Sequence, residues 1–137
     1  MSVYEHRRVS MIQKDKGELK VEEKVMLFYL VNLILLNQFN VANSLIKKHY
    51  LTMKKCNQVF KANVRRFQAL SLHRMYESEN QKKKTKITQN EKYIRKNKIE
   101  RILKRAEKHF NRAECAWGLG LTYYQQAMMK IHHIDQH

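Results

Sequence analysis

Proline is absent from this 137-residue chain, and glycine occurs only three times, at Gly17, Gly118 and Gly120. Both residue types interrupt helices and mark tight turns, so their scarcity favours long helices over a sheet. Hydrophobic residues make up 43% of the chain, which is enough for a modest helical core. The sequence therefore predicts an all-α fold.

The positive charge of the chain is concentrated in its middle half. Residues 47–112 carry 21 basic and five acidic groups, a net charge of +16 that equals the net charge of the whole chain. A compact domain with this imbalance repels itself unless a polyanion lies nearby. Nucleic acid is the first candidate for that polyanion, an anionic membrane surface is the second, and a merely solvated basic face is the third.

Residues 25–46 contain no charged side chain. The unbroken apolar part of this stretch ends at Asn32, and further amide side chains follow it closely, so we expect a buried helix rather than a membrane span. This first helix is predicted to run from about Glu18 to Gln38. A helix that is apolar on every side must be covered on more than one side, either by the rest of the chain or by a partner subunit.

A second helix is expected from Asn40 or Asn43, both good capping residues, to Tyr50. The segment "YLT" then forms a turn, and Thr52 caps a third helix that extends to Met75 or Tyr76. On a helical wheel this third helix is apolar on one side and basic on the other. Its apolar side holds Met53, Cys56, Phe60, Val64, Phe67 and Ser71.

A short helix, a turn and a longer basic helix form the helix-turn-helix arrangement of DNA-binding proteins. Long cationic and amide side chains on the outer side of such a helix bind phosphates and read base edges. We therefore predict a nucleic-acid-binding site made of Lys47, Lys48, Lys54, Lys55, Gln58, Lys61, Arg65 and Arg66.

The segment "LIKKHYLTMKKCNQVFKANVRR" resembles helices 2 and 3 of a homeodomain, and the resemblance extends over residues 18–67. It places the base-contacting positions of that family on Gln58, Lys61, Ala62 and Arg65. The family's core tryptophan is Val59 here, and its adenine-reading asparagine is Ala62. The resemblance therefore implies binding that is dominated by phosphate contacts, with little sequence preference.

The rest of the chain is predicted to support this domain, which spans residues 18–77. Residues 1–17 form a flexible basic arm, 78–90 a basic linker, and 91–137 a helical extension that begins near a cap at Thr88 and bends at residues 118–120. A second basic segment contributes Lys82, Lys83, Lys84, Lys86, Arg101, Lys104 and Arg105. The lysine run resembles a nuclear import signal, so we expect the protein in the nucleus.

No arrangement of side chains typical of an enzyme, a metal site or a cofactor site occurs in the sequence. We expect a non-catalytic protein that binds double-stranded DNA, outside any membrane, and joins a hetero-oligomer through the apolar first helix and the C-terminal apolar stripe. It is similar in kind to the homeobox-like accessory subunits of protist N6-adenine DNA methyltransferase complexes, so a DNA-modifying or chromatin complex is implied. The alternative is a basic helical protein of a ribosome or other RNA particle.

Overall fold

The computed structural model describes residues 18–49, 55–82 and 87–135, the last five of these through their backbone only. Within the described residues the chain forms five α-helices and no strand, so the predicted all-α fold is confirmed. The helices are α2 (Val21–Leu35), α3 (Phe39–Lys48), α5 (Gln58–Lys82), α6 (Gln89–Arg112) and α7 (Ala116–Asp135).

The first predicted helix is present as α2, but it is shorter at both ends than expected. Lys20 precedes the helix, and its backbone N–H donates to the Glu23 carboxylate over 2.9 Å. At the other end the chain leaves the helix after Leu35 and passes through Asn37, which has a φ of 60°. Asparagine tolerates this left-handed conformation, and it allows α3 to begin two residues later.

The predicted third helix is present as α5, but it begins at Gln58 and is capped by Asn57. The Asn57 side-chain oxygen accepts a 2.7 Å hydrogen bond from the Val59 N–H, as an N-cap residue does. The Asn57 N–H donates to the buried Glu23 carboxylate over 3.1 Å, which ties α5 to α2. The predicted turn at 50–52 and cap at Thr52 lie outside the described residues.

The far end of α5 reaches Lys82, so the first five residues of the predicted linker are helical. Contacts from α6 support this end of α5. The Arg95 guanidinium lies 4.4 Å from the centre of the Tyr76 ring and forms a 2.9 Å ion pair with Glu79. Sequence polarity alone suggested a linker because these supporting partners lie more than a dozen residues downstream.

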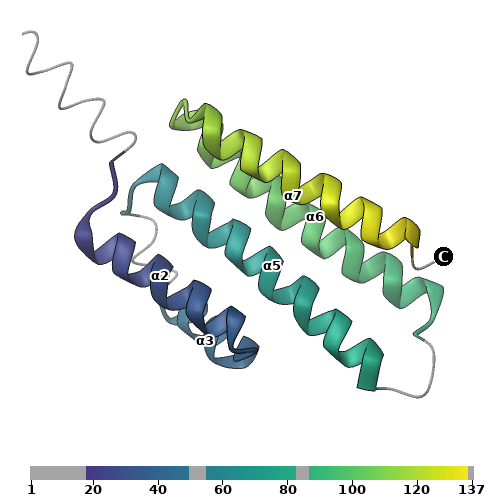
Figure 1. Cartoon of the computed structure of the whole chain (residues 1–137). Helices are drawn as coiled ribbons and strands as arrows, with labels where there is room; N and C mark the ends of the chain where they lie inside the picture. The colour runs from purple at the N-terminus through teal and green to yellow at the C-terminus, as the bar shows by residue number, and fades with distance from the viewer. Residues whose placement is uncertain (1–17, 50–54, 83–86, 136–137) are drawn as a thin grey trace, which may run out of the picture.

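Helix α5 runs through the middle of the molecule, with α2 and α3 on one side and α6 and α7 on the other (Figure 1). Its buried residues therefore belong to different cores. With α2 and α3 it shares the cluster of Leu27, Leu30, Leu33, Ile34, Phe39, Ala42, Ile46, Phe60 and Val64. On the α6 and α7 side it contributes to two clusters, Val59, Ala62, Phe110, Ala113 and Cys115, and Ala69, Leu72, Ile99, Ile102 and Leu103.

The C-terminal segment consists of two helices that meet at a sharp turn. The predicted cap at Thr88 is confirmed, since its Oγ1 accepts a 3.2 Å hydrogen bond from the Glu91 N–H. The predicted bend at residues 118–120 is wrong, because the break lies at residues 113–115, where Glu114 has a φ of 54°. Gly118 lies inside α7, where a Cβ atom would be 2.3 Å from the Phe110 ring. This glycine allows close helix packing rather than a bend.

Candidate nucleic-acid interface

The side of α5 that sequence analysis assigned to DNA faces α6 in the structure. The Gln58 side-chain oxygen lies 2.7 Å from His109 Nδ1, which donates to it from the neutral ring. Ala62, at the position of the adenine-reading residue of homeodomains, is 0% exposed and packs in the cluster around Phe110. Insertion of this side of α5 into a DNA groove would therefore require α6 to move away.

The other predicted contacts on α5 are divided between its two flanks. Lys61 and Arg65 are half-buried at the edge that borders α6, and Arg65 Nη1 donates to Gln68 Oε1 over 2.9 Å. Arg66 is half-buried elsewhere on the helix, where its guanidinium donates to Asn63 Oδ1 over 3.2 and 3.3 Å. Burial lowers the pKa of Arg66. A hydrogen bond of 3.0 Å from Gln125 of α7 to the Arg66 carbonyl marks this flank as the one next to α7.

The remaining predicted residues that the structure describes outside α6 come from separate segments of the chain. Lys47 and Lys48 are exposed at the end of α3, and Lys55 is exposed in the turn before α5. Lys82 is exposed at the last residue of α5. Four predicted lysines lie outside the described residues, namely Lys54, Lys83, Lys84 and Lys86.

Among the residues that the structure describes, the largest run of exposed cations is on α6. Five of its basic residues repeat at steps of three and four along the helix, so they share one face, and all of them are exposed. This α6 basic stripe consists of Lys98, Arg101, Arg105, Lys108 and Arg112, and the exposed Lys104 lies beside it. Sequence analysis included only Arg101, Lys104 and Arg105, because it read α6 through its apolar stripe. The three-four spacing of the cations was the signal that could have identified the rest.

Two of the three acidic residues of α6, Glu100 and Glu107, lie away from the basic stripe, whereas Glu91 falls on the same face seven residues before Lys98. At 100° per residue, Glu100 and Glu107 fall on a different side of the helix from the stripe residues. Glu107 accepts a 3.3 Å hydrogen bond from Tyr123 of α7, and Glu100 lies 4.0 Å from Lys96. From Lys98 to Arg112 the stripe therefore carries charges of one sign, which is what a polyanion needs.

The basic stripe is continuous with the cations of α5 around His109. Burial, followed by the positive charges of Lys61, Arg112, Arg65 and Lys108, lowers the pKa of His109 to about 4. Two of these cations come from α5 and two from α6. The lowered pKa of His109 therefore indicates that both helices contribute to one region of positive potential. Only tertiary packing brings these two sets of charges together.

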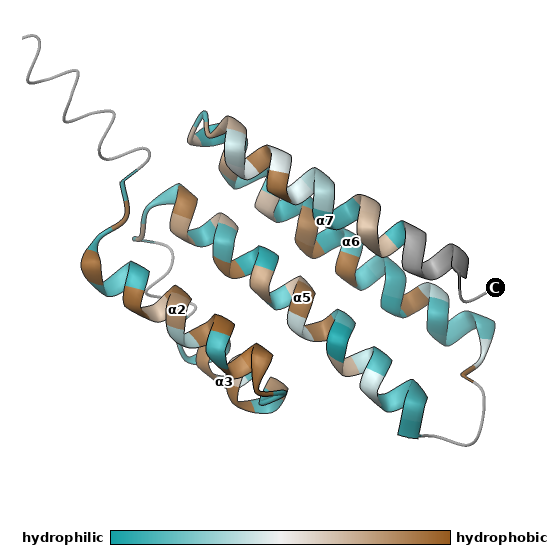
Figure 2. Ribbon diagram, viewed as in Figure 1, coloured by the Kyte–Doolittle hydropathy of each residue, from teal (hydrophilic) through white to brown (hydrophobic). Residues whose placement is uncertain are grey.

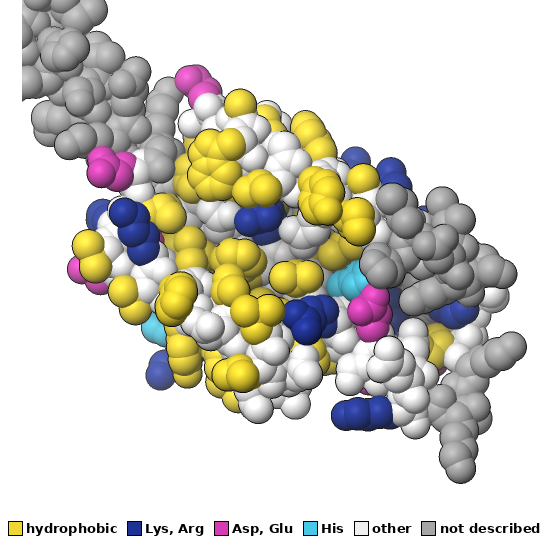
Figure 3. Space-filling model, viewed as in Figure 1, with side chains coloured by type: hydrophobic (Ala, Val, Ile, Leu, Met, Phe, Trp, Pro, Cys, Tyr) yellow, Lys and Arg dark blue, Asp and Glu magenta, His cyan; other side chains and the backbone are white. Residues whose placement is uncertain are grey.

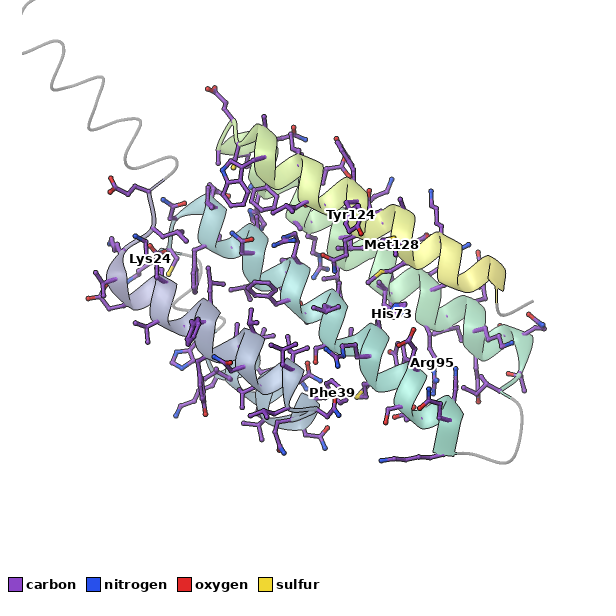
Figure 4. All side chains as sticks on the ribbon, in the orientation of Figure 1. Lys24, Phe39, His73, Arg95, Tyr124 and Met128 are labelled. Atoms are coloured by element: carbon purple, nitrogen blue, oxygen red, sulfur yellow. The ribbon has the colours of Figure 1, made fainter. Side chains whose placement is uncertain are left out.

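A cavity of about 480 Å³ lies between α5, α6 and α7, and its lining includes α6 residues around Lys98, at the start of the basic stripe. Its apolar lining includes Ile99, Leu103 and Met129. Its three carboxylates each contact another side chain, since Glu77 lies 2.7 Å from His73 while Glu100 and Glu107 make the contacts given above. Figure 4 shows His73 on α5 and Arg95 on α6, which both line this cavity. The carboxylates of this cavity therefore contact side chains of their own helix or of a neighbouring helix.

A second exposed surface of the molecule is apolar. Hydrophobic side chains gather over α2 and α7 on the face shown in Figure 3. From α2 the large exposed residues are Val21, Val25, Phe28, Tyr29, Leu35 and the adjoining Leu36. From α7 they are Trp117, Leu121, Tyr123 and Tyr124. They belong to the first helix and to the α7 part of the C-terminal stripe, which sequence analysis assigned to a protein partner. The α6 part of that stripe, residues 99–110, is instead buried within the chain.

Comparison with family models, with curated proteins and with solved structures finds no match for this chain. None of the helices in the described ranges is long and apolar enough to cross a membrane. The described residues also contain no group of three or more His, Cys, Asp or Glu side chains placed to hold a metal ion. The geometry of the two exposed surfaces is therefore the basis for a functional proposal.

Proposed function

We propose that this chain is a non-catalytic protein that binds double-stranded DNA through the α6 basic stripe. The observation that carries the proposal is the row of five exposed cations on one face of α6, continuous with Lys61 and Arg65 of α5. Arginine and lysine side chains in such a row neutralise phosphates and release the counterions condensed on nucleic acid. The stripe replaces the outer side of α5 as the expected contact surface.

The dimensions of the stripe suit a phosphate backbone. From Lys98 to Arg112 the helix rises about 21 Å, since each residue adds about 1.5 Å. Over that length B-DNA carries about 12 phosphate charges on its two strands. All five stripe residues are cationic, and phosphate contacts position a protein on DNA without reading its sequence. We therefore expect binding with little sequence preference.

The homeodomain resemblance contributes to this proposal in a limited way. Helices α2, α3 and α5 follow one another and share one core, which is compatible with a helix-turn-helix unit. The reading side of that unit would be α5, whose residues Gln58 and Ala62 are engaged with α6. The proposal therefore keeps the three-helix packing and moves the DNA contact to α6.

We further propose that the protein is a nuclear accessory subunit of a DNA-modifying or chromatin complex, such as one that methylates adenine N6. The apolar residues of α2 and α7 support this part of the proposal, because a monomer rarely exposes so many large hydrophobic side chains. A basic face and an apolar face on one small chain suit a subunit that holds DNA while other proteins do the chemistry.

The proposal is tested by measuring duplex binding of two charge-matched variants by fluorescence anisotropy. Arg101→Ala/Arg105→Ala removes two stripe cations and should weaken binding about tenfold, with the salt dependence reduced by about two released counterions. Lys20→Ala/Lys24→Ala removes two exposed cations outside the stripe and should change the affinity less than about twofold. Equal effects of the two variants would contradict the assignment of the stripe.

Binding of the same variants to an RNA duplex of the same length separates the proposal from the RNA-particle alternative. DNA binding predicts that the unsubstituted chain holds the DNA duplex at least as tightly as the RNA duplex. A clear preference for RNA, lost in Arg101→Ala/Arg105→Ala, would favour the RNA particle. The structure already differs from the single unbroken helix over 40–76 expected for that alternative, because α3 ends at Lys48 and α5 begins at Gln58.

A further inference from the structure

Helix α2 has two apolar faces, and the described part of the chain covers only one of them. The inner face packs in the core through Leu27, Leu30 and Ile34. On the opposite face the large side chains are mostly in solvent, for example Val25 at 62% and Phe28 at 73% exposure. Apolar side chains at such exposure lose the hydrophobic stabilisation that a covering surface would give. The arrangement implies that something covers the outer face of α2.

The outer face has the spacing of a coiled-coil seam. Its residues follow one another at steps of four, three, four and three, so they repeat every seven residues. We call these five residues the α2 seam, in which Val21, Phe28 and Leu35 occupy d positions and Val25 and Asn32 occupy a positions. A β-branched residue at a and a leucine at d favour two parallel strands, and the seam has this combination at Val25 and Leu35.

We propose that a second copy of this chain covers the α2 seam, in a parallel dimer with the two α2 helices in register. Asn32 points to this occupant, because a single asparagine at an a position specifies register and pairs with its own counterpart across a two-stranded seam. One N–H of the Asn32 carboxamide donates to the Phe28 carbonyl over 2.9 Å. A carboxamide has a second N–H and an oxygen, and these can pair with the Asn32 of the other copy.

The charges of the molecule also favour this meeting point. Two chains of net charge +16 repel each other, and the repulsion is smallest where the charges balance. The exposed charges beside the seam are Glu22 and Lys24, which cancel. The α6 basic stripe is separated from the seam by α5, which lies between the two helices (Figure 1). A dimer through α2 would therefore keep both stripes away from the interface.

The dimer needs no new folding. Isolated helices of this length are marginal in water, because helix nucleation is costly. Helix α2 is already held by the core it shares with α3 and α5, so association does not have to form it. A seam of only two heptads can then suffice.

The inference does not depend on DNA binding, and it is tested on nucleic-acid-free protein at high salt. Sedimentation velocity over a micromolar concentration series should show a species of twice the 16.6 kDa chain mass. Phe28→Glu should abolish this species. The matched variant Tyr124→Glu, at a similarly exposed aromatic residue on α7, should retain it. Circular dichroism checks that both variants keep their helices, and a separate anisotropy titration shows whether DNA binding persists.

Cysteine cross-linking tests the parallel register. Val21→Cys and Leu35→Cys should each form a disulfide-linked dimer by itself, against the unsubstituted chain as the background for its native cysteines. In an antiparallel pair centred on Phe28, cross-links would instead form only when the two variants are mixed. Such a result would overturn the parallel arrangement. A monomer at every concentration, or a dimer that survives Phe28→Glu and is lost in Tyr124→Glu, would overturn the assignment of the seam.

Discussion

Helices α6 and α2 present contrasting surfaces, although both pack one face against the core and leave the opposite face in solvent. The exposed face of α6 carries cations, whereas that of α2 carries valine, phenylalanine and leucine. Figure 2 shows the contrast, with α2 mostly hydrophobic and α6 mostly hydrophilic between its buried residues. A charged face is stable in water and attracts a polyanion, while an apolar face is stabilised by being covered. The two surfaces therefore suit the two different partners that we propose for them.

The largest expected effect separates the buried face of α2 from its exposed face, when one residue on each is replaced by alanine. Leu30→Ala, on the inner face, should lower the free energy of unfolding by about 3 kcal/mol, because it leaves a cavity at a residue that is 0% exposed. Phe28→Ala, on the seam, should lower it by less than about 0.5 kcal/mol. Urea denaturation at a concentration low enough to keep the chain monomeric measures both. Similar losses would mean that the seam is covered within the chain.

The packing of α7 against α6 can be disrupted by a substitution at Gly118 of α7. A Cβ atom in Gly118→Ala would lie 2.3 Å from the Phe110 ring, so the ring or α7 must shift. We expect a loss of about 2 kcal/mol in the free energy of unfolding, measured by thermal or urea denaturation. Gly120→Ala is the control, since nothing lies within 4 Å of its Cβ position. It should be neutral or stabilising by up to about 1 kcal/mol. An unchanged stability in Gly118→Ala would contradict the close packing of α6 and α7.

The smallest expected effect concerns pH and the α5–α6 boundary. The pKa of His109 falls from 6.5 to about 4 on folding, so between these values the unfolded chain binds more protons. The contribution of His109 to the free energy of unfolding is therefore fully present above pH 6.5 and is lost as the pH falls toward 4. Because the ring is half-exposed, solvent screening leaves an effect on the order of 1 kcal/mol. Urea denaturation at pH 7 and pH 5 should show this loss in the unsubstituted chain and a smaller one in His109→Gln. The same loss in both would mean that other groups dominate.

Much of the helical architecture could be predicted from local sequence. The scarcity of proline and glycine indicated the fold class, and the cap at Thr88 was placed correctly because Thr88 and Glu91 interact within one turn. The start of α5 was missed by five residues, since its cap is Asn57 and not Thr52. Asn57 is a good cap in any sequence, but its choice over Thr52 is supported by Glu23, which lies far away along the chain. Long-range partners of this kind carry no local signal.

The candidate site was predicted only in its charge type. The basic middle of the chain directed attention to residues 47–112, and Arg101, Lys104 and Arg105 are part of the exposed α6 surface or adjoin it. The helical wheel of α5 had one apolar and one basic side, so a single covered side was expected. Residues such as Val59, Ala62 and Ala69 are small or apolar enough to be buried on the second side as well.

The sequence by itself determined where helices form and where the charge lies, because helix propensity, capping and periodicity act over a few residues. Only the tertiary structure decided which faces are covered. It buried the second side of α5 under α6, and it left the outer face of α2 exposed. The physical reason is that burial depends on which helices meet. That choice is made by packing between residues distant in sequence, which the pattern within one helix does not contain.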